Sequence, residues 1–317
     1  AQVSGLSEEA LDLLDDDQVA AFSEDAVAGF DGDQLDIILD GFSDTQIEHL
    51  TAAQLNEVHA DVLDQLDDSQ VAAISEEVIA QLDGSQVDAI LDALTAGQIE
   101  QITAIQVDEL SADTLDQLQE DQVAAFTTSA VVSFDEDQLD VLVADLTDEQ
   151  FDVLTTTQID GLSEEALGSL SEHQVSLLSA ADLAVLDEDQ LDEVADFLTS
   201  TQISELTTTQ IAGLSEEALD SLNQDQVQAI STSAIAVLSS DDIEVLVEDL
   251  TTTQVAALSS TQLAGLGDLE LYQFSDEQVA ALSSSQLAGL NSSQLATLND
   301  NGSVSYTHLT LPTILLV

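Results

Sequence analysis

The adjacent stretches TTTQVAAL (Thr251–Leu258) and SSTQLAGL (Ser259–Leu266) show the unit from which almost the whole chain is built. This unit is an eight-residue block with the pattern [S/T/D]-x-x-Q-[V/I/L]-x-x-L. From residue 7 to residue 302 there are 34 such blocks, and Ser, Thr, Asp or Asn opens 31 of them. The eighth position of every eight-residue block is Leu, Ile, Val or Phe. An internal repeat this regular indicates a solenoid-type architecture.

The block pattern predicts a short helix that starts again every eight residues. With Thr251 as the N-cap, Gln254 stands three residues later and completes a capping box. Leu250 and Val255 have the spacing of a hydrophobic staple around the same cap. One continuous helix is excluded, because eight residues advance about 800° and the apolar face would drift by about 80° per block. The apolar spacing also differs from a coiled-coil heptad and from strand alternation.

A second period of 52 residues lies above the first. The blocks that contain Gln-Val or its equivalent recur at Gln18, Gln70 and Gln122, and so on to Gln278, always 52 residues apart. Every sixth block is four residues longer, as in Asp31–Phe42, Asp83–Leu94, Asp135–Leu146, Asp187–Leu198 and Ser239–Leu250.

Each twelve-residue block is expected to form a longer helix. In the first of them, four apolar residues share one helix face, namely Leu35, Ile38, Leu39 and Phe42. Our hypothesis is that a whole number of superhelical coils closes every 52 residues, so that the long helices stack in register along one edge. The alternative is repetition by gene duplication without geometric closure.

A single block is too small to fold alone. Burying two large apolar side chains gains about 3–6 kcal/mol, whereas fixing eight backbone residues costs about 8–16 kcal/mol. Stability must therefore come from blocks stacked on blocks, with the fifth and eighth positions forming the core. The sequence predicts an all-α solenoid, or superhelix, of short capped helices that forms one repeat domain over residues 1–302. Phenylalanines are expected to fill block ends at Phe22, Phe30, Phe42, Phe126, Phe134 and Phe274.

Both ends of the sequence depart from the repeat. Ala1–Leu6 matches the last six positions of a block, so we expect a fragment that starts within a repeat. Residues 303–317 lack the pattern and are expected to be a non-native tail. Within them, VSYTHLTLPT (Val304–Thr313) resembles the translation of a transposase-type sequencing adapter. The competing interpretation is a short apolar terminal strand or a damaged anchor, since the tail is too short to span a bilayer.

The composition excludes several classes of function. The chain has 65 Asp and Glu, no Lys or Arg, and a formal net charge of -65. A chain without basic side chains cannot neutralise phosphates, so we expect no binding to nucleic acid and none to anionic lipid. Since 44% of the residues are hydrophobic, the acidic chain is not expected to be disordered. There is no Cys, so disulfides and Cys-ligated metals are absent.

No motif for catalysis stands out, and we expect that the protein is not an enzyme. Phosphate loops with Lys, G-x-S-x-G and H-E-x-x-H are absent. Four histidines have no shared ligand spacing, and nothing distinguishes one pair of carboxylates from the rest. The least regular block is GDLELYQF (Gly267–Phe274), where we expect a local bulge, although drift within a repeat also explains it.

Calcium is the one cofactor that the sequence raises. Asp15, Asp16 and Asp17 form one run of oxygen ligands near a turn, and Asp31 and Asp33 form another. Hard divalent cations prefer such oxygens. No block has the spacing of an EF-hand loop or of secreted calcium-binding nonapeptides, and Asp at an N-cap already has a capping role. Diffuse stabilisation by cations that screen the repelling carboxylates is the alternative.

The octads resemble tandem "LTTxQVxxL" tracts of very large predicted bacterial surface or secreted proteins. The resemblance covers about Ala1 to Gly302 and implies a non-catalytic repeat region of an adhesin or a type I secreted protein. It also implies an extracellular or cell-surface location. SEEALDSL (Ser215–Leu222) and TTTQIAGL (Thr207–Leu214) are similar to the first helix of TAL-effector repeats. The second long helix, the base-reading loop and the basic charge of those repeats are absent, so DNA binding is not implied.

Two functions remain open at this stage. The first is an extended acidic spacer or adhesive stalk within a larger secreted or surface bacterial protein. The second is an acidic solenoid that docks a basic protein partner or mimics the charge of DNA, because solenoids offer long surfaces and a charge of -65 steers cations. An acidic proteome from a high-salt habitat explains the composition without either function. The sequence leaves the oligomeric state open.

Overall fold

The computed structural model describes residues 3–301, and the tail expected at 303–317 lies outside the described residues. Throughout the described range the secondary structure is helical, and each of the 34 blocks contributes one α-helix. The chain divides into two compact units, Ala1–Leu162 and Ser163–Val317, and the boundary falls between two blocks. The protein is therefore an all-α helical repeat, as the octads predict.

The first unit contains a short 3-10 helix followed by eighteen α-helices and three further 3-10 turns. In chain order they are η1 (Val3–Gly5), α1 (Glu8–Leu11), α2 (Asp16–Val19), α3 (Glu24–Val27), α4 (Gly32–Ile38), η2 (Leu39–Gly41), α5 (Asp44–Ile47), α6 (Ala52–Leu55), α7 (Ala60–Leu63), α8 (Asp68–Ala73), α9 (Glu76–Ile79), α10 (Gly84–Ile90), η3 (Leu91–Ala93), α11 (Ala96–Ile99), α12 (Ala104–Val107), α13 (Ala112–Leu115), α14 (Glu120–Val123), α15 (Thr128–Val131), α16 (Glu136–Leu142), η4 (Val143–Asp145), α17 (Asp148–Phe151) and α18 (Thr156–Gly161).

The second unit continues the same pattern with slightly longer short helices. Its described elements are α19 (Glu164–Gly168), α20 (Glu172–Leu177), α21 (Ala180–Leu183), α22 (Glu188–Val194), η5 (Ala195–Phe197), α23 (Ser200–Glu205), α24 (Thr208–Gly213), α25 (Glu216–Ser221), α26 (Gln224–Ala229), α27 (Thr232–Ile235), α28 (Ser240–Leu246), α29 (Thr252–Ala257), α30 (Ser260–Gly265), α31 (Asp268–Gln273), α32 (Asp276–Ala281), α33 (Ser284–Leu287) and α34 (Ser292–Asn301).

Most blocks fold as their capping signals predict, although the N-cap side chains of α1, α3 and α10 make no capping bond. In α29, Thr251 has an extended backbone, its side chain accepts the N–H of Gln254, and the reciprocal bond from the Thr251 N–H completes the capping box. The helix ends at Leu258, whose φ of -59° and ψ of 138° return the chain to an extended conformation. No described residue has a positive φ. Two extended residues between helices, rather than left-handed glycines, therefore turn the chain at each corner.

The core consists of the apolar residues at the fifth and eighth block positions, as predicted. Val255 and Leu258 of α29 are almost completely buried, and the same positions are buried in most other blocks. Of the phenylalanines assigned to the core, all are buried except Phe22, which is half-buried. Phe22 nevertheless packs edge-to-face against Phe30, with ring centroids 5.2 Å apart.

In four of the six long blocks a 3-10 turn interrupts the single longer helix that the sequence predicts, whereas the last long block forms the ten-residue helix α34. In the first, α4 ends at Ile38, whose φ of -125° leaves the helical region, and the 3-10 turn η2 follows. Breaking the helix allows both halves to face the core, because Leu35, Ile38, Leu39 and Phe42 are all buried. The long block thus bends round a corner and contributes two successive sides to the coil.

Glutamine side chains join one coil to the next, a role that the octad pattern does not predict. Gln98 accepts the N–H of its N-cap Thr95 through Oε1 at 2.8 Å. Its Nε2 donates to the carbonyl oxygens of Val71 at 2.8 Å and Ile74 at 2.7 Å. These carbonyls lie at the C-terminal end of α8, where carbonyls lack the amide four residues later that a continuing helix would supply. One side chain therefore starts its own helix and satisfies the end of a helix in the previous coil.

This glutamine ladder runs through both units. Its bonds reach back between 24 and 31 residues, as for Gln150, Gln158, Gln202, Gln254 and Gln286. Among the described residues, every polar side chain classed as buried is a glutamine of this kind. No buried side-chain nitrogen or oxygen in that range lacks a hydrogen-bond partner. The uncharged amides thus form the polar component of an otherwise apolar interior.

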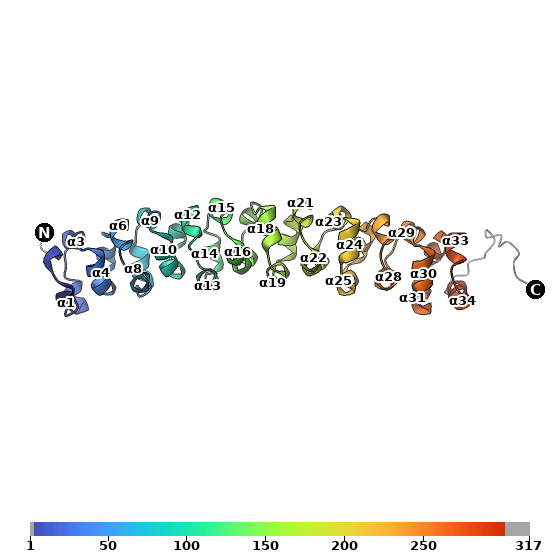
Figure 1. Cartoon of the computed structure of the whole chain (residues 1–317), viewed down its shortest axis with the longest axis horizontal. Coiled ribbons are helices and arrows are strands. Elements are labelled where there is room, and N and C mark those ends of the chain that lie inside the picture. The colour runs from blue at the N-terminus through green and yellow to red at the C-terminus, as the bar shows by residue number, and fades with distance from the viewer. Residues whose placement is uncertain (1–2, 302–317) are drawn as a thin grey trace, which may run out of the picture. The chain divides into compact units, whose positions relative to one another are not determined.

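Two coils complete one 52-residue super-repeat. In the first unit, α7 packs on η2 behind it and on α10 ahead of it, so that one layer separates α4 from α10. In the second unit, α25 lies in the same way between η5 and α28. The long helices α4, α10 and α16 follow one another along one side of the first unit, as Figure 1 shows. These contacts agree with the hypothesis that a whole number of coils fits the period.

A steric pairing of glycine with a larger residue fixes how the coils approach. A Cβ on Gly84, the first residue of α10, would lie 2.5 Å from the Cβ of Glu109 in the adjacent coil. In later super-repeats the two residues change places, because Glu136 faces Gly161 and its side chain leaves no room for another Cβ. The five pairs are Gly32 with Glu57, Gly84 with Glu109, Glu136 with Gly161, Glu188 with Gly213, and Ser240 with Gly265.

Candidate functional surface

On the long helices α4, α10 and α22, an aspartate accepts the N–H of the residue that begins a short helix of the next coil. Asp88 on α10 accepts the N–H of Ser111, the N-cap residue of α13, at 2.8 Å. The same bond recurs from His59 to Asp36 at 2.8 Å and from Ser215 to Asp192 at 3.0 Å. These aspartates are half-buried, so the bond combines a partly shielded charge with the N-terminal end of a helix.

Further carboxylates gather around these caps on the same edge of each unit. We call this surface the acidic edge. It is formed by the long helices and the short helices that pack against them, α1 on α4, α7 on α10, α13 on α16, α19 on α22 and α25 on α28. Its carboxylates are exposed or half-buried. They are Glu9, Asp12, Asp36, Asp40, Asp61, Asp64, Asp88, Asp92, Asp113 and Asp116 in the first unit, and Glu165, Asp192, Asp196, Glu217, Asp220, Glu244 and Glu248 in the second.

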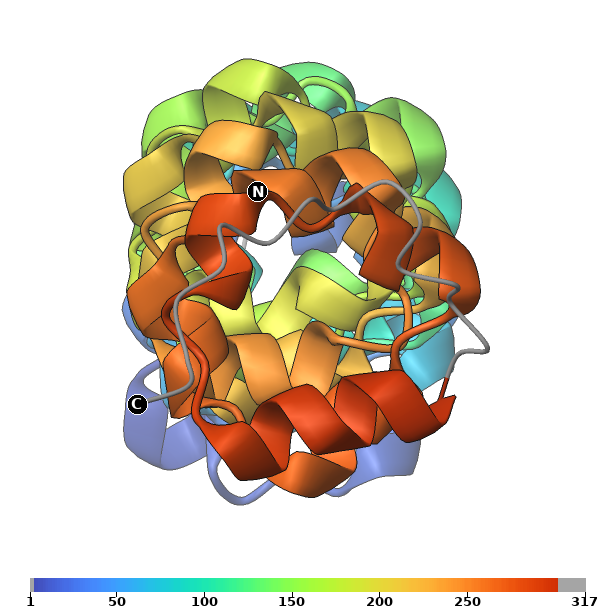
Figure 2. The same cartoon turned by 90° about the vertical axis from the view of Figure 1, so that its right-hand side faces the viewer.

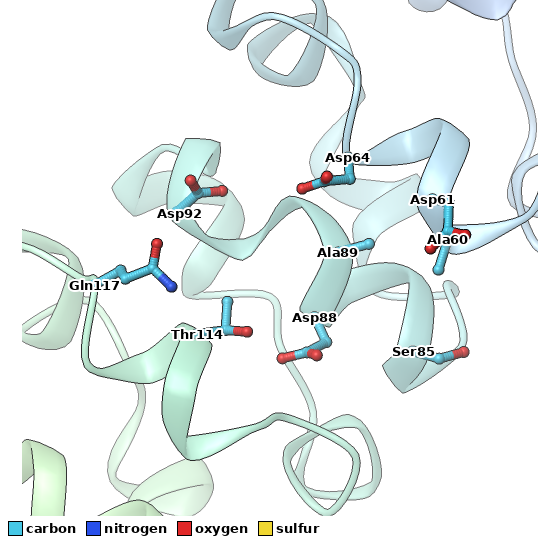
Figure 3. Close-up of a pocket in the computed structure, with 9 residues that line it drawn as sticks. All are labelled: Ala60, Asp61, Asp64, Ser85, Asp88, Ala89, Asp92, Thr114 and Gln117. Carbon is cyan, nitrogen blue, oxygen red and sulfur yellow. The ribbon is translucent and has the colours of Figure 1, made fainter.

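The acidic edge of the first unit contains an open pocket of about 290 Å³. Figure 3 shows four aspartates around it, Asp61 and Asp64 at α7, Asp88 on α10 and Asp92 on η3. Thr114 and Gln117, from the region of α13, complete the polar lining, and the alanines Ala60 and Ala89 leave the pocket shallow. The pocket therefore presents negative charge from two coils to solvent, with neutral hydrogen-bonding groups beside it.

Histidine provides the positive charges that can pair with these carboxylates, since Lys and Arg are absent. His59 Nδ1 lies 2.5 Å from Asp36 Oδ2, and His49 Nε2 lies 3.3 Å from Glu24. The hydrogen bond to Asp36, helped by its charge, raises the pKa of His59, and Asp33 and Asp61 add smaller attractions. His59 occupies a position where other super-repeats have Ser111 or Ser215, so its pairing is a local addition to the repeat.

The aspartates proposed as calcium ligands lie at two separate helix starts. Asp15 caps α2 and Asp31 caps α4, each accepting the N–H of the glutamine three residues later. Asp16 and Asp17 lie exposed in the first turn of α2, and Asp33 lies exposed in the first turn of α4. Within residues 3–301 no three His, Asp or Glu side chains form a group arranged to hold a metal ion. Two of the five candidates therefore act as caps here.

The irregular block Gly267–Phe274 forms the regular six-residue helix α31 rather than a bulge. This block differs from the other blocks in its exposed side chains. Leu269 is 77% exposed and Tyr272 is 59% exposed, at positions where the preceding super-repeat has Glu217 and Asp220. Gly267 supplies no side-chain cap. The acidic edge therefore changes character at this block.

Comparison with known proteins adds no further assignment. No protein-family model matches the chain, and a search of curated proteins found no match. The class of protein that the structure defines is an all-α helical repeat whose coils are joined by glutamine. Within the described residues, no helix combines the length and the apolar character needed to span a bilayer.

Proposed function

We propose that this chain is a non-catalytic structural repeat region, a spacer or adhesive stalk, of a larger secreted or cell-surface bacterial protein. The observation that supports this most directly is the recurrent glutamine ladder, in which buried glutamines of both units join successive coils. Repeats that contact mainly their neighbours can be extended in number without changing the local structure. The length of such a repeat region can therefore change, through the number of repeats, more easily than its local structure.

Small-angle X-ray scattering of the chain tests this proposal. A globular protein of about 300 residues has a radius of gyration of about 19 Å. A spacer formed by one continuous coil must give a clearly larger value and a pair-distance distribution with a long tail. A value near the globular expectation would contradict the proposed role.

A second candidate function rests on the acidic edge. We propose as the alternative that this edge docks a basic protein segment, for which the pocket lined by Asp61, Asp64, Asp88 and Asp92 provides a site of concentrated negative charge. A charge of -65 without any Lys or Arg accelerates encounters with cations. Calcium is the inorganic cation that this alternative admits as a stabilising ligand, since carboxylate oxygens suit it.

Binding of a lysine-rich peptide, measured by calorimetry at two salt concentrations, tests the alternative. The variant Asp61→Asn with Asp64→Asn removes two charges from the pocket, whereas Asp16→Asn with Asp17→Asn removes two exposed charges from α2. If the edge is the site, the pocket variant weakens binding several-fold more than its control at 0.15 M salt. Equal weakening by both variants would show that only the total charge matters.

A further inference from the structure

We infer that each unit extends under tension coil by coil, so that the chain acts as a reserve of length rather than as a rigid rod. The inference deepens the proposed structural role and rests on it for its biological use, whereas the mechanical behaviour is a property of the coils themselves. Its basis is the way in which neighbouring coils are held together.

The first observation is that cohesion is confined to adjacent coils. The principal helix contacts, such as α5 with α8, α10 with α12 and α23 with α26, join elements of the same or the next coil. In Figure 2, where the C-terminal coils of the second unit face the viewer, the helices follow one another around the axis and each coil lies on the one behind it. Stability in such an array is a sum of neighbour terms, so one coil can detach without unfolding the others.

The second observation concerns the kind of bond between coils. No disulfide links them, because the chain has no Cys. Carboxylates find a cationic partner only where a histidine is near, as at His59 and His49. Apolar contacts and the glutamine bonds therefore carry most of the cohesion, and both re-form when the coil closes again.

The third observation is the repulsion that favours extension. Carboxylates line the acidic edge on successive coils, and lengthening the chain increases the distances between them. At low salt this repulsion acts over several coils, because the Debye length rises from about 10 Å at 0.1 M to about 30 Å at 0.01 M. The tension needed for extension should therefore fall as the salt concentration falls.

The length of one step follows from the period. A coil contains half of the 52-residue super-repeat, about 26 residues, and about 3.5 Å per residue gives about 90 Å when it is fully extended. One layer of packed helices occupies about 10 Å. Each coil should therefore release about 80 Å, and a super-repeat that opens as one piece should release about 160 Å.

Optical-tweezer extension of the full chain, with handles at both ends, tests the inference. We expect several reversible events of about 80 or 160 Å, at forces that decrease between 0.5 M and 0.01 M salt. A single event that releases the whole folded length, or extension forces independent of salt, would overturn the inference.

A pair of isosteric variants locates the bonds that resist extension. Gln98→Glu keeps the Oε1 acceptor for Thr95 but replaces the donor to Val71 and Ile74 with an oxygen. Gln18→Glu makes the same change at a capping box in the first coil, where the glutamine is exposed. We expect Gln98→Glu to shift one event to lower force and Gln18→Glu to leave the pattern unchanged. A uniform shift of all events by Gln98→Glu would overturn coil-by-coil extension.

Discussion

Exchanging Gly84 and Glu109 provides a direct test of the steric pairing between coils. In the variant Gly84→Glu, a Cβ would lie 2.5 Å from the Cβ of Glu109 and 2.9 Å from the carbonyl oxygen of Gln106. Neither neighbour is the end of a flexible side chain, so the coils must move apart. Overpacking of this kind costs about 2–3 kcal/mol.

The reverse single change removes a bond rather than adding a clash. Glu109→Gly loses the Oε2 acceptor that lies 3.0 Å from the N–H of Ser85 in the first turn of α10. The loss of one partly exposed hydrogen bond costs about 1 kcal/mol, and the added glycine costs about 0.5–1 kcal/mol through the unfolded state. If the two changes acted additively, the double variant would therefore be less stable than the original chain by about 4 kcal/mol.

The double variant Gly84→Glu with Glu109→Gly should be much more stable than that sum. It recreates the arrangement that the chain itself uses at Glu136 with Gly161, so we expect stability within about 1 kcal/mol of the original chain. Urea unfolding followed by far-UV circular dichroism gives the global stability. Hydrogen exchange of the amides of α10 and α12 gives the local effect, since repeat proteins open in parts.

A matched glycine provides the control. Gly97 in α11 would place its Cβ 2.9 Å from Oε1 of Glu76, which is the mobile end of a side chain. Gly97→Ala should therefore be neutral or stabilising, whereas Gly84→Ala should be clearly destabilising. Additive energies in the double variant, or equal effects of the two alanine substitutions, would refute the steric argument.

Three further predictions concern charge. Because the pKa of His59 is raised, its pairing with Asp36 stabilises the fold below the unfolded pKa of about 6.5, and this stabilisation is lost as the pH rises through the folded pKa. The difference in Tm between the original chain and His59→Ser should therefore shrink from pH 5.5 to pH 8.5. A constant difference would contradict this. Asp88→Ala should lower the stability measured by urea unfolding by about 1 kcal/mol, because the bond to the N–H of Ser111 is lost. Asp92→Ala removes an exposed charge from the same pocket and should change the stability by less than about 0.5 kcal/mol. Equal effects would show that the cap is not stabilising. Raising NaCl from 0.01 to 0.5 M should raise the Tm, and calcium at matched ionic strength should have the same effect, whereas an added rise well below millimolar calcium would demonstrate specific sites.

Much of the local structure could be predicted from the sequence, because it depends on residues close together in the chain. The capping box at Thr251 and Gln254 requires four consecutive residues, and the burial of Val255 and Leu258 follows from their place in the block. The period of 52 also indicated that long blocks return to one edge. These features are repeated in most blocks, so the signal is strong.

The contacts between coils were not predictable in the same way. The donors of Gln98 reach acceptors 24 and 27 residues earlier, and nothing within its own block distinguishes this from simple capping. The break after Ile38 is not predictable from the block, because the apolar spacing is compatible with a continuous helix and the break is imposed by the corner of the coil. The sequence shows that glycine and glutamate change places between super-repeats. Its steric reason becomes clear only when the structure shows that the two residues face each other across neighbouring coils.

For the acidic edge, the composition could be predicted from the sequence, but the positions of its carboxylates relative to one another could not. Asp15 and Asp31 were candidates for metal because aspartates cluster around them, yet both cap helices. Asp88 and Asp92 come together with Asp61 and Asp64 through stacking of α7 and α10, which lie in different blocks. Which side chains meet on the surface depends on how many helices make up one coil, and the block pattern does not specify that number.

The alternation of Gly84 with Glu109 and of Glu136 with Gly161 has a consequence for how such a gene can change its length. Both members of a pair lie within one super-repeat, 25 residues apart. Unequal crossing-over that joins super-repeats outside this interval leaves every pair matched, and the array gains or loses 52 residues without strain. A crossover inside the interval between super-repeats of opposite arrangement, such as those of Gly84 and Glu136, brings two glutamates or two glycines together and produces either a clash or a gap. The pairing therefore favours recombination that adds or removes whole super-repeats.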